Sequence, residues 1–200
     1  MPDTKRRSRG LAPGRVRIIG GAWRSRLIAV PAVAALRPTP DRVRETLFNW
    51  LGQDLSGLAC LDLFTGSGVL GFEAASRGAA RVVMVEQDRA ALAALERSRA
   101  ALSAEQVSIV AADVSQWLAR AGERFDVVFL DPPFRQNALP ALLDELPPCL
   151  VHGARVYAEG PALIEAAAPW RELNRGRAGL VHFQLLQWGE HDRSGLPRDI

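Results

Sequence analysis

The sequence predicts an α/β fold in which helices cover both faces of a doubly wound, mostly parallel sheet. From residue 58 onwards, short apolar runs alternate with amphipathic segments, which is the pattern of repeated strand–helix units. Several runs are apolar throughout, as strands buried on both faces are. The length of 200 residues, with 48% hydrophobic and 24% charged residues, suits one globular domain with a small addition.

The beginning of the chain is predicted to form an extension to this domain. Residues 1–14 are expected to be a disordered basic tail, and residues 15–52 a hairpin and a helix ahead of a main domain at 53–200. The apolar stretches Val16–Ile19 and Leu27–Val30 flank a Gly-Gly pair and an arginine-rich segment. This arrangement predicts a small β-hairpin with a basic tip or edge.

A helix is predicted in the segment "RPTPDRVRETLFNWLG". Thr39 is the expected cap, Pro40 suits the first turn, and Gly52 ends the helix. Its apolar stripe consists of Val43, Leu47, Trp50 and Leu51, and excludes Arg42, Arg44 and Glu45.

In the main domain the predicted strands and helices alternate. The strands are expected at 58–64, 80–86, 106–113, 125–131 and 154–160, and the helices at 69–78, 88–102, 114–120 and 138–146. Asp88 is the expected cap of the second of these helices. After residue 169, two strand-like runs around "RGRAG" predict a closing antiparallel hairpin.

Composition and charge limit the classes of function. No apolar run approaches the roughly 20 residues that span a membrane, and the basic N-terminus lacks the apolar segment of a secretory signal. Cys60, Cys149 and the three histidines show no ligand spacing. We therefore expect reduced thiols, no metal, no membrane association and a cytoplasmic location.

The first fifty residues carry an excess of eight positive charges, whereas the remaining 150 hold 14 basic and 19 acidic residues. This asymmetry predicts contact with a polyanion. An arginine-rich composition with a solvated tail is the alternative, because Lys5 is the only lysine. The candidate nucleic-acid contacts are Arg15, Arg17, Arg24, Arg26, Arg42 and Arg135.

Ligands of an open α/β sheet bind beyond the carboxyl ends of its strands. After the first strand, Gly66, Gly68 and Gly71 satisfy GxGxxG, which permits close approach of a ligand to the backbone and to a helix N-terminus. Glu86 ends the second strand about twenty residues later, where an acid binds a ribose. Asp113 ends the third, in position to hold an adenine amine. The glycines also suit an NAD enzyme, while a P-loop motif is absent.

The fourth strand ends in Asp131, Pro132, Pro133 and Phe134. The two prolines make a stiff turn whose carbonyls stay free to accept hydrogen bonds. A carboxylate, a carbonyl and a flat ring are therefore held together at the ligand-binding edge. This motif and Asp113 favour transfer to a base amine over hydride transfer. The simpler alternative is a strand end, a turn and a core phenylalanine.

The segments "DLFTGSGVLGFEAASRGA", "FDVVFLDPPF", "LRPTPDRVRETLFNWL" and "RIIGGAWRSRLIAVP" resemble the bacterial 16S ribosomal RNA guanine-N2 methyltransferases of the RsmD type. The resemblance extends from about Arg15 to the final hairpin. It implies a Rossmann-like class I methyltransferase fold, with seven strands of which the last is antiparallel, and S-adenosylmethionine as the cofactor. The cofactor contacts that it implies are Thr39, Asp62, Phe64, Gly66, Ser67, Gly68, Glu86, Asp113 and Asp131.

The same resemblance assigns the target base to residues 131–134. An exocyclic amine is a poor nucleophile, because its lone pair is conjugated with the ring. Asp131 and the Pro132 carbonyl can accept its hydrogens, and Phe134 can stack on the extruded base. The expected partner is 16S ribosomal RNA or a small-subunit particle, and the expected state is a monomer.

Two alternatives remain at this point. The tetrapeptide DPPF also occurs in adenine-N6 methyltransferases of DNA and RNA, so it indicates the amine of a base without saying which base. Guanine N2 rests on the resemblance. The chain could also be a non-catalytic, RNA-binding assembly factor that retains a cofactor fold.

Overall fold

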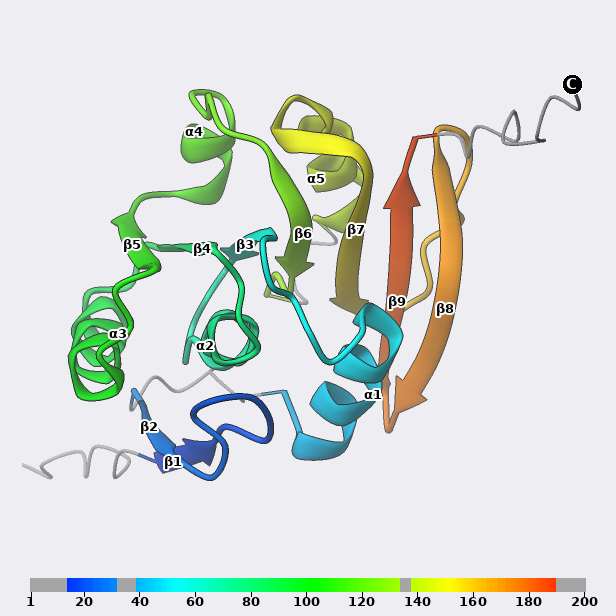
Figure 1. Ribbon diagram of the computed structural model, residues 1–200. Helices are drawn as coiled ribbons and strands as arrows, with labels where there is room; N and C mark the ends of the chain where they lie inside the picture. The colour runs from blue at the N-terminus through cyan, green and yellow to red at the C-terminus, as the bar shows by residue number, and fades with distance from the viewer. Residues whose placement is uncertain (1–13, 32–38, 134–137, 190–200) are drawn as a thin grey trace, which may run out of the picture.

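The computed structural model describes residues 14–31, 39–133 and 138–189, and a seven-stranded sheet forms its middle layer (Figure 1). The strands are β3 (Ala59–Leu63), β4 (Arg81–Glu86), β5 (Val107–Ala111), β6 (Phe125–Leu130), β7 (Leu150–Gly160), β8 (Trp170–Ala178) and β9 (Val181–Trp188). Their order is β5-β4-β3-β6-β7-β9-β8. Strands β3 to β7 pair in parallel, and β9 is antiparallel to both of its neighbours. The predicted doubly wound α/β fold is confirmed, including its antiparallel last strand.

Helices cover both faces of this sheet. They are α1 (Asp41–Leu51), α2 (Val69–Ser76), α3 (Arg89–Leu102), α4 (Val114–Leu118) and α5 (Leu139–Glu145), followed by the 3₁₀ turn η2 (Pro147–Cys149). Figure 1 shows α4 and α5 on one face and α1, α2 and α3 on the other. Successive strand residues point to opposite faces, so Cys60 packs in the cluster under α2 while Leu61 packs in the cluster under α4 and α5. The predicted cap Asp88 is confirmed at the start of α3.

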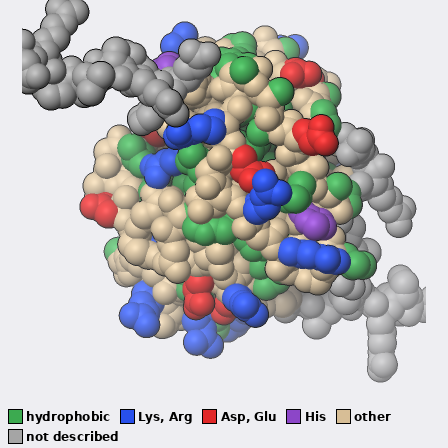
Figure 2. Space-filling model, turned by 90° about the vertical axis from the view of Figure 1, so that its right-hand side faces the viewer, with side chains coloured by type: hydrophobic (Ala, Val, Ile, Leu, Met, Phe, Trp, Pro, Cys, Tyr) green, Lys and Arg blue, Asp and Glu red, His purple; other side chains and the backbone are tan. Residues whose placement is uncertain are grey.

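The final hairpin is confirmed, but its turn lies later than predicted. The strands β8 and β9 are joined at residues 179–180, so most of "RGRAG" belongs to β8. Figure 2 shows the side of the molecule that carries β8, where arginines lie among carboxylates rather than in one continuous patch. No helix among the described residues is both long and apolar enough to cross a membrane.

The predicted N-terminal hairpin is also confirmed, as the antiparallel strands β1 (Gly14–Arg17) and β2 (Leu27–Val30). The loop between them docks on the end of α2. The Ser76 hydroxyl donates to the Gly20 carbonyl at 2.6 Å and accepts from the Trp23 N–H at 2.9 Å. Gly21 has φ +73°, and a Cβ there would lie 1.9 Å from the Ser76 carbonyl oxygen. This contact explains why a glycine is needed at that point of the loop.

Helix α1 begins differently from the prediction. Pro40 takes the cap position and no side chain caps the helix, so the expectation that Thr39 caps it is wrong. Thr39 is buried, and its carbonyl accepts a hydrogen bond from Arg44 Nε at 3.1 Å. Gly52 ends the helix with φ +93°, as predicted.

The prediction that Arg44 lies off the buried stripe of α1 is wrong as well, because its side chain is fully buried. Arg44 Nη1 lies 2.5 Å from Glu73 Oε1 of α2, and Nη2 lies 2.6 Å from Asp41. Glu73 Oε1 also accepts the Ile19 N–H at 2.6 Å. One buried carboxylate therefore joins the hairpin loop, α1 and α2.

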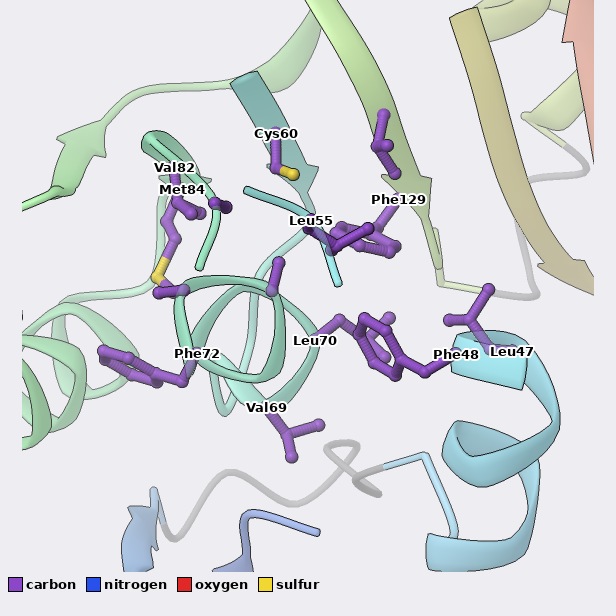
Figure 3. Packing of buried hydrophobic residues seen from close by; sticks show 14 of the residues in the cluster. Leu47, Phe48, Leu55, Cys60, Val69, Leu70, Phe72, Val82, Met84 and Phe129 are labelled. Atoms are coloured by element: carbon purple, nitrogen blue, oxygen red, sulfur yellow. The ribbon is translucent and has the colours of Figure 1, made fainter. Parts of the chain in front are cut away.

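Apolar packing reinforces this junction. Leu47 and Phe48 of α1 are fully buried, and Figure 3 shows Phe48 pointing from α1 toward Leu70 of α2. The ring of Phe48 also lies 6.1 Å from that of Phe129, centroid to centroid. Each large apolar side chain that is fully buried contributes about 1.5–3 kcal/mol to folding. The extension is thus attached to the sheet layer by a continuous core.

Candidate active site

The loop after β3 turns sharply at the carboxyl edge of the sheet. Phe64, Gly66 and Gly68 all have positive φ, at 61°, 55° and 78°. The Thr65 hydroxyl donates toward the carbonyls of Asp62 and Val85, at 2.7 and 3.1 Å, which ties the loop to β3 and β4. A left-handed phenylalanine is costly and such strain is concentrated at functional sites, so this loop is a candidate binding element.

The glycines of this loop bring α2 close to the sheet. A Cβ at Gly68 would lie 2.4 Å from Leu95, and a Cβ at Gly71 would lie 2.4 Å from Met84 and 3.0 Å from Asp62 Oδ2. Because of this close approach, the Gly71 N–H donates to Asp62 Oδ2 at 2.9 Å. Burial raises the pKa of Asp62 well above its usual value, and the nearby Glu86 raises it further.

Glu86 lies at the rim of the glycine loop. Its Oε2 accepts from the Gly66 N–H, and its Oε1 accepts from the N–H groups of Gln87 and Asp88, all at 2.8 Å. A carboxylate has about four lone-pair sites, so these bonds fix its orientation and leave capacity for a ribose hydroxyl. The role of Glu86 in ribose binding stays a prediction.

Ser67 and Asp113 lie at the same edge. Ser67 is buried, and its hydroxyl oxygen lies 3.4 Å from the Val69 N–H donor. Asp113 is exposed beyond β5 and caps α4 by accepting the Gln116 N–H at 3.1 Å. The structure therefore brings the predicted cofactor residues of three successive strand ends to one edge of the sheet.

Asp131 follows β6 directly and heads the turn that contains the buried Pro132 and the exposed Pro133. Burial raises the pKa of the Asp131 carboxyl well above its usual value, and the neighbouring carboxylates of Glu159 and Asp62 add to this effect. The predicted base-stacking Phe134 and the predicted RNA contact Arg135 lie outside the described residues.

Glu159 and Tyr157, at the end of β7, were missed by the sequence analysis. The Tyr157 hydroxyl donates to Glu159 Oε2 at 2.9 Å, and both side chains are buried. The signal for Glu159 is present in the sequence. The predicted strand "ARVYAEG" has an acid near its carboxyl end, as the other four predicted strands do. The Thr39 side chain lowers the pKa of the same carboxyl, which places Thr39 near this edge instead of at a helix cap.

The three acids at this edge are each the direct chain neighbour of an apolar residue that packs on the α4 and α5 face. The pairs are Asp62 with Leu63, Asp131 with Leu130, and Glu159 with Ala158. The three carboxyl groups therefore point to the face covered by α1 and α2. None of the ion pairs among the described residues includes them. In the same ranges, no group of three or more acidic, histidine or cysteine side chains gathers closely enough to hold a metal.

Buried carboxylates without a counter-charge are costly. An organic cation beside the glycine loop would relieve that cost, and S-adenosylmethionine carries both a sulfonium and an ammonium group. The donor set thus fits this cofactor. A seven-stranded sheet with an antiparallel last strand, a glycine turn and acids at successive strand ends together define a class I S-adenosylmethionine-dependent methyltransferase.

Comparisons with known proteins place the chain within this class. The family model described as Conserved hypothetical protein 95 matches residues 16–187. The Ribosomal RNA small subunit methyltransferase D of Escherichia coli K12 is 41% identical over 179 residues, covering 87% of this chain and 90% of the relative. That of Haemophilus influenzae is 39% identical over 186 residues, covering 88% and 95%. The chain belongs to this family.

Solved structures agree with the assignment of the fold. An Escherichia coli protein matches with a TM-score of 0.80 at 39% identity, covering 88% of this chain and 99% of its own. The protein SMU.776, solved with S-adenosylhomocysteine, matches with a TM-score of 0.59 at 16% identity, covering 73% of this chain and 48% of its own. At that identity the likeness concerns the fold alone.

Five of the six predicted nucleic-acid contacts lie on the extension. Arg15, Arg17, Arg24, Arg26 and Arg42 are all exposed. One of them is engaged within the protein, since Arg26 Nη2 donates to the Ala101 carbonyl of α3. Contact of these arginines with RNA stays a prediction.

Proposed function

We propose that this protein transfers a methyl group from S-adenosylmethionine to the exocyclic N2 of a guanine in 16S ribosomal RNA. The observation that carries the proposal is the position of Asp131, which is half-buried at the head of the Asp-Pro-Pro turn and close enough to Asp62 for the two carboxyl groups to interact. The names of the relatives support ribosomal RNA of the small subunit as the substrate. We place the reaction on this RNA or its assembling particle, in the cytoplasm.

In this proposal the protein orients the amine. Asp131 and the Pro132 carbonyl accept the two N2 hydrogens, which favours a pyramidal nitrogen whose lone pair is free to react. The cofactor supplies a methyl group that is already activated, so much of the rate comes from placement. Burial raises the pKa of Asp131, which makes it a stronger base and suits it to accept the proton that the amine loses.

A covalent cysteine route has no support among the two thiols of the chain. Both Cys60 and Cys149 are buried. Burial raises the pKa of Cys60 to about 12, and it also raises that of Cys149. Since the thiolate is the nucleophilic form, direct transfer to the amine is the mechanism that these residues allow.

The test of this function is the modification that disappears when the gene is deleted. We expect 16S ribosomal RNA from the deletion strain to lack one N2-methylguanosine, and purified protein with S-adenosylmethionine to restore it. Mass spectrometry of nucleosides measures both. Loss of N6-methyladenosine instead would identify an adenine enzyme. A full set of modifications in the deletion strain would indicate a non-catalytic assembly factor.

Cofactor affinity is expected to rise with pH. The pKa values of Asp62, Asp131 and Glu159 are raised, chiefly by burial, so these groups hold protons to higher pH than usual. A cationic ligand favours their charged forms and therefore releases protons on binding. Affinity should increase by up to about tenfold per pH unit for each proton released, and level off above the raised pKa values. Calorimetry between about pH 5 and about pH 8 measures this slope.

The stability of the free protein should change in the opposite direction. A carboxyl whose folded pKa is raised stabilises the fold at low pH, and this contribution is lost as the pH rises through the folded pKa.

S-adenosylhomocysteine is the control ligand for the measurement of affinity. It lacks the sulfonium charge, so its affinity should depend less steeply on pH than that of S-adenosylmethionine. Equal slopes for the two ligands would contradict the assignment of the cation to this site.

A further inference from the structure

Glu159 stands next to Asp131 at the carboxyl edge of the sheet. Leu130 of β6 and Ala158 of β7 are the last paired positions of the two strands. Asp131 and Glu159 each come one residue later and point to the same face. Neighbouring strands are about 4.8 Å apart, so the two carboxylates are close enough to meet adjacent groups on one edge of a base.

The Glu159 side chain is held firmly in this position. It is 6% exposed, and its Oε2 accepts from the fully buried Tyr157 hydroxyl at 2.9 Å. Burial raises the pKa of Tyr157 well above its usual value, so Tyr157 stays protonated and remains a donor. The Thr39 side chain lies near enough to lower the pKa of this carboxyl, which partly offsets the effect of burial. The hydrogen bond from Tyr157 leaves part of the accepting capacity of the carboxylate unused.

Glu159 also borders a small hollow of about 10 Å³ against the catalytic turn. Pro132, Pro133 and Leu139 form apolar parts of its lining, with Gly160 beside Glu159. A Cβ at Gly160 would lie 2.7 Å from Leu139, so the wall is tight there. Glu159 is the acidic residue of this lining, so the end of β7 and the Asp-Pro-Pro turn border the same hollow.

Bases differ at the edge that would meet these carboxylates. Guanine presents the N2 amine next to the N1 hydrogen, which makes two adjacent donors. Adenine presents its N6 amine next to N1, which is an acceptor. A pair of adjacent carboxylates matches the donor–donor edge and repels a lone pair at N1. A site built to hydrogen-bond a substrate group rejects analogues that lack it far more strongly than an apolar pocket does.

We propose that Glu159 is a specificity-determining residue that accepts the N1 hydrogen of the target guanine while Asp131 accepts from N2. This assignment rests on the proposed function and explains how the enzyme selects guanine over adenine. Tyr157 acts through Glu159 and is a positioning residue.

The test compares two RNA substrates that differ at the target position, one with guanine and one with 2-aminopurine. The analogue keeps the 2-amine, but its N1 is an acceptor. We expect the wild-type single-turnover rate to favour guanine by roughly 10²-fold or more. In Glu159→Gln the side-chain amide can donate to N1 of the analogue, so this preference should fall at least about tenfold.

Further variants keep the result interpretable. Tyr157→Phe removes a donor to Glu159 and should also lower the preference for guanine over 2-aminopurine, by a smaller factor. If Glu159→Gln does not fold, Tyr157→Phe tests the proposed role of Glu159. Glu165→Gln changes an exposed glutamate beyond β7 and should keep the wild-type preference. An unchanged preference in folded Glu159→Gln and Tyr157→Phe overturns this inference while guanine methylation stands. A wild-type enzyme that does not methylate guanine overturns the proposed function itself.

Discussion

Replacing Asp131 with alanine should lower the single-turnover rate of methyl transfer by roughly 10²–10⁴-fold. In the proposed mechanism the carboxylate is used most fully as the N2 nitrogen becomes pyramidal, so its removal raises the barrier to the chemical step. Cofactor binding should weaken but persist, because the glycine loop, Glu86 and the other two carboxyl groups at this edge, Asp62 and Glu159, are untouched. The assay measures transfer of labelled methyl to ribosomal RNA substrate under conditions of excess enzyme, and calorimetry measures cofactor affinity.

Two further variants separate chemistry from folding. Asp131→Asn keeps an oxygen acceptor without the charge and should retain more activity than alanine. Asp144→Ala removes an exposed aspartate of α5 and should leave the rate unchanged. If folded Asp131→Ala turned over at nearly the wild-type rate, the Asp-Pro-Pro turn would be a structural feature and the mechanism would be wrong.

The largest expected loss of stability follows from replacing Arg44 with methionine. This change leaves Glu73 as a buried carboxylate without its closest cation, 2.5 Å away in the native protein. Breaking a buried ion pair by removing one partner costs about 3–5 kcal/mol. Arg77, 3.4 Å from Glu73 Oε2, compensates for only part of the charge, because burial also disfavours its own charged form and lowers its pKa. Equilibrium unfolding in urea measures the free energy of unfolding.

The matched control is Arg42→Met on the same helix. Arg42 is exposed and forms no ion pair among the described residues, so its replacement should change the free energy of unfolding by less than about 0.5 kcal/mol. Similar stabilities for the two variants would show that the Arg44–Glu73 pair does not anchor the extension.

Regular elements were predictable wherever local signals agreed. The strand β6 and the cap Asp88 of α3 are each indicated by a few neighbouring residues in the sequence, and the structure confirms both. The order of the chain alone likewise predicted that Gly66, Glu86 and Asp131 lie at the carboxyl edge of the sheet, where the structure has them. Thr39 shows where local reasoning fails. A threonine before Pro-Asp has the sequence of a cap, yet its side chain lies near Glu159 on β7, about 120 residues away in the chain.

The strand–helix alternation, the glycine turn and the acids that end the strands follow from the amino-acid sequence alone, because each depends on backbone preferences or on the spacing of nearby residues. In contrast, the burial of Arg44 against Glu73 and the position of Glu159 beside Asp131 become evident only in the folded protein. Both facts depend on which distant elements come into contact. A charge is costly to bury because the packed layers form an interior of low dielectric constant. The partner that a buried charge requires therefore depends on which elements pack around it.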